Sequence, residues 1–259
     1  MKSTSRILLF LLLAVLPITL MAQNPTIILA YMKVTPGHYS DYLEVEQAWK
    51  KVHQKAVELD VHNGWQLWRN VHAGANDPYQ YITIQWYDNY EHYFGENAPD
   101  GWMNEVYTET EWDELMEKSI ASRTYACEEV AHQVTGVDNP GLVKYILVTR
   151  MKVKPGMDAD YVKMEKEIFK PYHEELIKRG LMTHWGIWNS WPQKEGKTRY
   201  AAMNGYGNVK QLTAPGIEIS PAELNLDLTW EQVVELTQKT REMVSSELWE
   251  LVDYVFPEE

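Results

Sequence analysis

The chain has 259 residues, with 24 Lys and Arg against 37 Asp and Glu and a formal net charge of −13. Such an acidic surface repels phosphate backbones, which disfavours nucleic acid as a partner. The length allows one or two domains with a sizeable core. The single cysteine, Cys127, excludes an internal disulfide, so the core must supply the stability.

The first 22 residues have the pattern of a secretory signal. Lys2 and Arg6 form a basic start, residues 7–21 are almost wholly apolar, and Ala22 is a small residue before the expected cleavage site. An internal proline keeps the unbroken apolar run shorter than the roughly 20 residues that a membrane span needs. We therefore expect an exported protein, periplasmic or secreted, with no stable membrane insertion after signal removal.

A segment of fifteen residues occurs twice, at 32–46 and at 151–165. Eight of its positions are identical, where about one is expected by chance from average composition. A repeat of this length is too long for a solenoid unit and indicates two whole domains. Further matches follow in the same order: Trp65 and Trp68 with Trp185 and Trp188, Tyr81 and Tyr87 with Tyr200 and Tyr206, Trp112 with Trp230, and Arg123 with Arg241.

Both copies predict the same elements in the same order. A β-rich run ends in a Pro-Gly turn, and a helix with an apolar stripe follows it. In the second copy Pro171 predicts a kink or break of that helix, which ends at Gly180. The strands expected in the first copy are 26–34, 64–71, 79–87 and 128–134, and those in the second are 143–153, 183–191, 199–206 and 247–255. The helices expected in the first copy are 39–59 and 110–122. In the second copy the first helix carries an apolar stripe over 161–176, and the second helix is 229–244.

The order β-α-β-β-α-β is that of the ferredoxin-like split unit. One such unit has a four-stranded antiparallel sheet with helices on one face, so its bare face must be buried. We predict an α+β fold of two tandem ferredoxin-like domains, 25–134 and 142–256, joined by a linker at 135–141 and packed sheet to sheet as a pseudo-dimeric α/β barrel. The mature chain is then a monomer with an internal pseudo-dimer, and further association between chains stays open.

This duplicated order, with a Pro-Gly turn before the first helix, resembles the dimeric α/β barrel superfamily. That group includes antibiotic-biosynthesis-type monooxygenases, muconolactone isomerases, haem-degrading monooxygenases and chlorite dismutase relatives. The resemblance covers nearly all of the mature chain but rests on architecture, and the chemistries of the superfamily are diverse. It implies a pocket in each half, between sheet and helices, that holds a small and often apolar or aromatic molecule. Haem is a minor alternative, with His53 or His173 as its axial ligand.

Glu46 and His53 lie seven residues apart on the first helix, and Glu165 and His173 lie eight apart in the second copy. A carboxylate and an imidazole that face one pocket can perform general acid–base chemistry, so these four are the catalytic candidates. The alternative is that the histidines are merely packed or solvated. The second copy has one extra residue before its Trp-rich strand. If that residue falls after the helix, His53 matches Tyr172 instead of His173.

Aromatic and basic side chains supply the ligand-binding candidates. The two tryptophans of each Trp-rich strand point to opposite faces, so we expect one in the core and one in the pocket, with both in the core as the alternative. An arginine closes the second helix of each copy, where it interacts either with the helix dipole or with an anion in the pocket. The candidates are Tyr42, Trp65, Trp68 and Arg123, with Tyr161, Trp185, Trp188 and Arg241.

Several motifs are missing from the sequence. It has no His-Glu-x-x-His, Cys-x-x-Cys or calcium-loop pattern, so no metal site is predicted. It has no Gly-x-Ser-x-Gly, P-loop or Gly-x-Gly-x-x-Gly either, which argues against serine hydrolases and nucleotide or dinucleotide binding. The cofactor stays undetermined.

We interpret the chain as an exported small-molecule-binding protein. A cofactor-free monooxygenase- or isomerase-like enzyme is one form of this hypothesis, and a non-catalytic ligand-binding or structural module is the alternative. Ala201 and Ala202 occupy the positions that match Ile82 and Thr83 of the first copy. Their small side chains favour a larger cavity in the second half.

Overall fold

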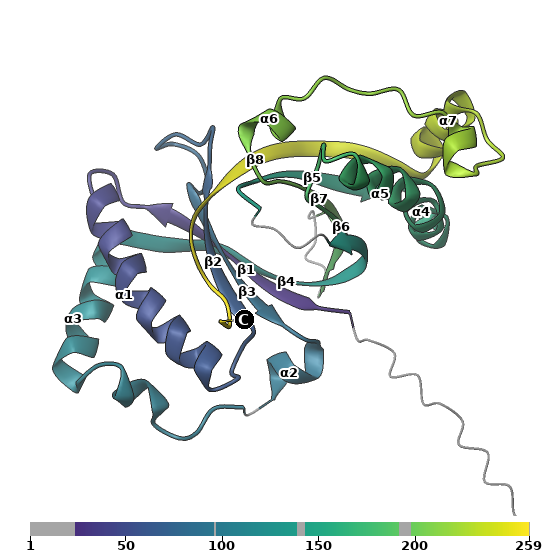
Figure 1. Ribbon diagram of the computed structural model, residues 1–259. Helices are drawn as coiled ribbons and strands as arrows, with labels where there is room; N and C mark the ends of the chain where they lie inside the picture. Colours follow the sequence, from purple (N-terminus) through teal and green to yellow (C-terminus); the bar gives the residue numbers. More distant parts are fainter. Residues whose placement is uncertain (1–23, 96, 139–142, 192–197, 259) are drawn as a thin grey trace, which may run out of the picture.

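The computed structural model describes residues 24–95, 97–138, 143–191 and 198–258 (Figure 1). The predicted signal, residues 1–22, lies outside this part of the chain. Across the described residues, no helix has both the length and the apolar character that a membrane crossing requires.

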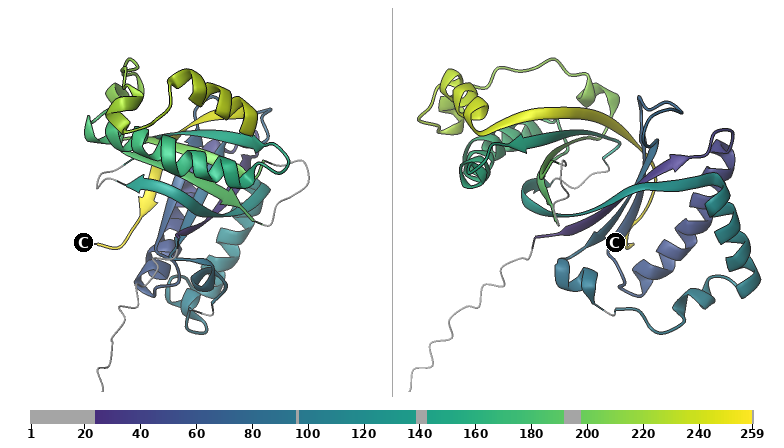
Figure 2. Two further views of the ribbon diagram at one scale, coloured as in Figure 1. Left: turned by 90° about the vertical axis from the view of Figure 1, so that its right-hand side faces the viewer. Right: turned by 180° about the vertical axis from the view of Figure 1, so that it is seen from behind.

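Eight antiparallel strands close into one barrel in the order β1-β3-β2-β8-β5-β7-β6-β4. The helices lie outside the barrel, those of the first half on one side and those of the second half on the other (Figures 1 and 2). The strands are β1 (Thr26–Val34), β2 (Gly64–Asn70), β3 (Tyr81–Tyr87), β4 (Arg123–Asp138), β5 (Tyr145–Val153), β6 (His184–Ser190), β7 (Tyr200–Tyr206) and β8 (Arg241–Val255).

The two longest strands, β4 and β8, join the halves. β4 pairs with β1 over residues 123–132 and with β6 over residues 131–138. β8 pairs with β5 over its first part and with β2 over residues 249–255. The two sheets are thus continuous through hydrogen bonds at both seams. The linker predicted at 135–141 begins too early, because Thr135 to Asp138 continue β4 in its pairing with β6; residues 139–142 lie outside the described chain.

The barrel interior is a shared apolar core, in which the faces that each sheet would otherwise leave bare are buried. Both halves contribute side chains to it. They include Ile27, Leu29, Tyr31, Trp68, Ile82 and Ile84 from the first half and Ile146, Val148, Trp188, Ala201, Met203, Trp249 and Leu251 from the second.

The helices of the first half form where the apolar stripe predicted them. The long helix α1 (Tyr39–Glu58) buries the stripe that includes Tyr42, Val45 and Val52 against the sheet. Helix α3 (Glu109–Ser122) starts with a capping box, in which Thr108 and Glu111 satisfy each other's backbone N–H groups. Two short elements precede it, α2 (Tyr90–Phe94) and the 3₁₀ turn η1 (Trp102–Glu105).

The long helix of the second half has a π-helical turn in its middle. It consists of α4 (Asp158–Met164), the π turn η2 (Glu165–Phe169) and α5 (Lys170–Lys178). Pro171 cannot donate a backbone hydrogen bond, and a π turn adds one residue without ending the helix. In place of the kink or break predicted at Pro171, the helix therefore has a π turn just before this proline. The remaining helical elements are α6 (Val209–Leu212), η3 (Pro221–Leu224) and α7 (Trp230–Thr240).

The ends of α3 and α7 correct two predicted boundaries. Helix α7 stops at Thr240 instead of continuing to residue 244, and β4 and β8 begin several residues before their predicted starts. Arg123 and Arg241 have extended backbones and open these strands. Their side chains are therefore directed by strand geometry and do not extend from the last turn of a helix.

Candidate functional site

A buried carboxylate and a buried guanidinium meet between sheet and helix in each half. In the first half the guanidinium of Arg123 donates to the carboxylate of Glu46, with side chains only 6% and 1% exposed. In the second half Arg241 Nε lies 3.5 Å from Glu165 Oε1. Strands β4 and β8 supply the arginines, and α1 and η2 supply the carboxylates. The arginines thus bind acidic groups of their own chain, a partner that the sequence did not indicate.

A pair of tyrosines adjoins each of these ion pairs. The Tyr42 and Tyr81 rings lie 4.7 Å apart, and the Tyr161 and Tyr200 rings lie 4.8 Å apart. The arginine of each half lies 5.8 or 5.9 Å from the ring of the helical tyrosine. Tyr42 and Tyr161 are therefore packed beneath the ion pairs, and burial raises the pKa of both hydroxyls.

The two candidate histidines occupy matching places. The His53 ring stacks on Trp65 at 5.0 Å and 14°, and the His173 ring stacks on Trp185 at 4.5 Å and 11°. The extra residue of the second copy therefore falls inside the helix, in the π turn. His53 corresponds to His173, and the alternative match to Tyr172 is wrong.

Burial keeps both imidazoles neutral. His53 Nδ1 lies 3.1 Å from His62 Nε2, and burial together with the neighbouring His62 holds the pKa of His53 well below its ordinary value. Burial lowers the pKa of His62 and of His173 to about 4, and His173 Nδ1 lies 2.7 Å from the carbonyl oxygen of Phe169. A base that resists protonation so strongly is poorly matched to proton transfer near neutral pH.

Glu165 is the candidate whose titration lies nearest neutrality. Burial raises its pKa to about 7, although the charge of Arg241 opposes this rise. A carboxyl group with such a pKa exchanges protons readily at physiological pH. The catalytic role of Glu46, His53, Glu165 and His173 stays a prediction.

A cavity of about 100 Å³ lies between α1 and the sheet of the first half. Trp65, which is fully buried, is one of its walls, and its indole N–H has no hydrogen-bond acceptor among the described residues. The cavity is smaller than the roughly 300 Å³ of a typical drug-sized site. It suits a molecule of a few heavy atoms or the reacting end of a larger one. Its other lining residues are Ile28, Ala30, Met32, Glu46, Trp49, His53, Thr83, Gln85, Arg123, Tyr125 and Glu128.

The structure separates the two tryptophans of each strand. Trp65 and Trp185 lie on the helix side, whereas Trp68 and Trp188 point into the barrel interior and belong to its core. The ligand-binding role predicted for Trp68 and Trp188 is therefore wrong, because strand alternation directs them away from the helix-side cavity.

Several lining residues escaped the sequence analysis because they depend on strand register. Gln85 lies opposite Trp65 in the pairing of β2 with β3. Tyr125 and Glu128 are three residues apart and would normally face opposite sides. A bulge in β4, where the register shifts between Cys127 and Tyr125, brings both to the cavity. Register and bulges depend on partner strands that are distant in sequence.

The alanines of β7 do not enlarge a ligand cavity. Ala202 packs in the core between sheet and helices, and Ala201 packs inside the barrel. The larger opening of the second half, about 570 Å³, lies between α4 and α7 and is lined by other residues. The reason that we gave for a larger cavity in this half is therefore wrong.

The residues present do not fit haem. The cavity beside His53 is far too small for a porphyrin, and the Nδ1 of this histidine already contacts His62. The face of the His173 ring is covered by Trp185. Across the described chain, no three His, Cys, Asp or Glu side chains form a group that could hold a metal ion.

Two solved structures share this fold over nearly the whole chain. A candidate monooxygenase from Lactobacillus acidophilus NCFM is 12% identical, with a TM-score of 0.52, and the match covers 90% of this chain and 97% of that one. Another from Fusobacterium nucleatum subsp. nucleatum ATCC 25586 is 7% identical, with a TM-score of 0.55 and coverages of 91% and 96%. At such low identity the likeness shows the α+β barrel fold alone. No family model and no curated protein matches the sequence.

Proposed function

We propose that the chain is an exported small-molecule-binding protein built from two tandem ferredoxin-like halves, with its ligand site in the first-half cavity. The observation that carries this proposal concerns Trp65, a lining residue of the cavity, whose buried indole N–H has no acceptor among the described residues. A buried donor without a partner costs about 1–3 kcal/mol. A ligand that brings an acceptor offsets this cost.

The tandem origin is supported by the symmetry of the barrel. Its strand order contains β4-β1-β3-β2 from the first half and β8-β5-β7-β6 from the second, and each strand corresponds to its counterpart in the other half. The paired contacts of Glu46 with Arg123 and of Glu165 with Arg241 agree with the same correspondence. Both arguments support the pseudo-dimer that the sequence repeat predicts.

The charges around the cavity favour a neutral ligand. The charge of Arg123 is already balanced by Glu46. An anionic ligand would have to compete with Glu46 for the same guanidinium. The remaining walls combine apolar side chains with the neutral polar groups of Thr83 and Gln85. The ligand class that fits is therefore a small neutral molecule with one carbonyl or hydroxyl acceptor.

The test follows the indole N–H of Trp65 by NMR while cyclohexanone, phenol or benzoate is added. The Trp65→Phe variant assigns the resonance. We expect the Trp65 signal to shift with cyclohexanone and phenol at concentrations where benzoate leaves it unchanged. Trp185→Phe is the matched control, because Trp185 has the same histidine stack in the other half and lies outside the cavity lining. Signals that move at Trp185 but not at Trp65 would contradict the proposal.

An enzymatic form of this function has one specific support, the fold shared with two candidate monooxygenases. A cofactor-free monooxygenase or isomerase needs a group that takes a proton from its substrate. In the first-half cavity Glu46 is the candidate. Oxygen uptake with small phenols, present in the wild type and lost in Glu46→Gln, would support the enzyme. Ligand binding without turnover would leave the non-catalytic binder as the function.

Export is supported by the signal pattern of residues 1–22. Sequencing the N-terminus of protein purified from its own host tests this part of the proposal. We expect the mature chain to begin at Gln23. A chain that retains the basic start would contradict it.

A further inference from the structure

A groove of about 570 Å³ lies between α4 and α7 in the second half and shares no lining residue with the first-half cavity. Its floor is apolar. Met164 and Ile168 come from the helix that contains the π turn, Leu236 comes from α7, and Leu226 and Leu228 come from the segment before α7. This volume falls within the range of about 300–1,000 Å³ that is usual for small-molecule sites.

In the first half, the corresponding helices are bridged by two aromatic side chains. The Trp49 ring lies 5.7 Å from Trp112, and its indole N–H donates to Ser119 Oγ at 3.1 Å. The Tyr107 hydroxyl donates to the carbonyl oxygen of Ala48 at 3.0 Å. Aromatic side chains therefore connect α1 with α3 and with the segment that precedes α3.

The second half has a different aromatic contact between its helices, in which the Tyr172 ring lies 5.6 Å from Trp230. Where the groove opens, its apolar side chains are aliphatic. Ile168 stands three residues after Glu165, as Trp49 stands three residues after Glu46. Leu228 directly precedes the cap of α7, as Tyr107 precedes the cap of α3. Helix α7 has 11 residues where α3 has 14. Smaller side chains and a shorter helix together account for the groove.

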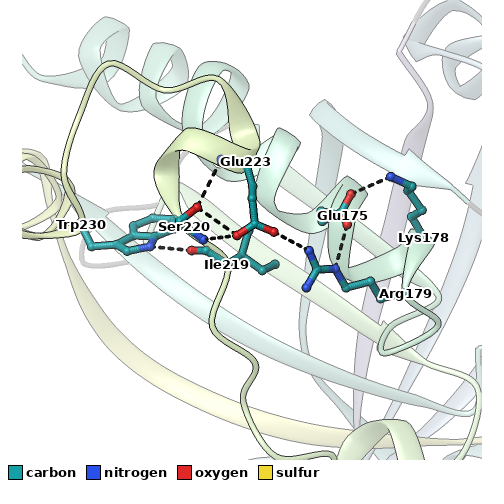
Figure 3. A network of polar contacts seen from close by, with 7 residues as sticks. All are labelled: Glu175, Lys178, Arg179, Ile219, Ser220, Glu223 and Trp230. Carbon is teal, nitrogen blue, oxygen red and sulfur yellow. Dashed lines mark hydrogen bonds and ion pairs between the residues drawn. The ribbon is translucent and has the colours of Figure 1, made fainter.

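A polar network anchors the segment that leads into residues 225–228 of the groove lining (Figure 3). Arg179 donates to Glu223 at 2.9 Å, and the indole N–H of Trp230 donates to the carbonyl oxygen of Ile219 at 2.7 Å. These contacts fasten the segment around η3 to the end of α5 and to α7 (Figure 3). These contacts restrain the segment that supplies Leu226 and Leu228, which reduces the ordering cost of binding there.

The rim of the groove carries nearly balanced charge. Lys163 and Lys239 stand among Asp160, Glu167 and Asp227, and Lys163 Nζ lies 3.9 Å from Glu167. Such a rim attracts neither sign of charge strongly. Binding in the groove therefore depends on the apolar floor.

We propose that the α4–α7 groove is a second ligand site, which binds a neutral aromatic molecule of one or two rings. The occupant has the chemistry that Trp49 and Tyr107 supply in the first half, a flat apolar ring. Apolar cavities with such walls bind aromatic molecules. This site is independent of the proposed function of the first-half cavity.

Fluorescence of N-phenyl-1-naphthylamine, a neutral probe that brightens in apolar surroundings, tests the proposal, with indole as the competitor. We expect wild-type protein to enhance the probe and indole to displace it. Ile168→Trp places the first-half side chain in the groove and should weaken probe binding at least tenfold. Val234→Trp adds the same side chain at a position on α7 that is 53% exposed, and should leave binding unchanged.

A folded Ile168→Trp protein that binds the probe as tightly as the wild type overturns the proposal. A wild-type protein that does not enhance the fluorescence of the probe overturns it as well. If Ile168→Trp does not fold, Leu228→Tyr decides by the same readout. Trp65→Phe separates the two sites. It alters the first-half cavity, which is too small for a naphthyl group, and should leave probe binding intact.

Discussion

Replacing Glu165 with Gln tests whether burial raises the pKa of this carboxyl group. The folded protein holds that pKa at about 7, against 4.5 for an unperturbed glutamate, because the group is buried despite its contact with Arg241. A raised carboxyl pKa means that the folded state prefers the protonated form. The stability that this preference contributes is fully present below pH 4.5 and is lost as the pH rises through 7.

The magnitude follows from the size of that pKa difference. Since one pKa unit corresponds to about 1.36 kcal/mol, the change from 4.5 to about 7 is worth roughly 3 kcal/mol at most. The neutral amide of the Glu165→Gln variant resembles the protonated carboxyl group at every pH. The free energy of unfolding of this variant, relative to the wild type, should therefore rise by up to roughly 3 kcal/mol between pH 4.5 and pH 8.

Urea unfolding at the two pH values measures this double difference, in which the other titrating groups cancel. Glu167→Gln is the matched control, because it changes the same residue type in the same π turn at a side chain that is 63% exposed. We expect its double difference to stay within about 0.5 kcal/mol. A Glu165→Gln value as small as that of the control would refute the burial argument.

Two further predictions concern the first-half site. Glu46→Gln leaves the buried guanidinium of Arg123 without its carboxylate and should lower the unfolding free energy by about 3–5 kcal/mol, measured by urea unfolding at pH 7; a loss below about 1 kcal/mol would speak against the ion pair. His53→Phe keeps the stack on Trp65 but leaves the buried His62 Nε2 without its contact, so it should cost about 1–3 kcal/mol and leave the cyclohexanone shift of Trp65 intact. A folded His53→Phe protein that no longer responds to cyclohexanone would show that the imidazole itself contacts the ligand.

Local patterns in the sequence were sufficient for the elements and for the buried helix faces. The apolar stripe predicted α1 within one residue at its end, and it placed Tyr42 and Tyr161 on buried faces. The repeat predicted which residues of the two halves correspond, and Glu46 and Glu165 occupy matching buried positions. These features depend on residues a few positions apart, and such spacing is visible in one sequence.

The tertiary structure decided the partners of those residues. Arg123 meets Glu46 because β4 starts directly after α3 and lies beside β1, a pairing of segments about a hundred residues apart. The same holds for the bulge that turns Tyr125 and Glu128 to one side. Strand register arises from pairing between distant segments, and it does not appear in the periodicity of either one.

The sequence by itself determined the composition of each helix and strand, the repeat, and the presence of an extra residue in the second copy. Only the folded chain showed that this residue forms the π turn, which keeps His173 over Trp185 as His53 lies over Trp65. It also showed that Trp68 and Trp188 face the barrel interior. The physical reason is that side-chain orientation depends on backbone geometry and on packing against segments far away in the sequence.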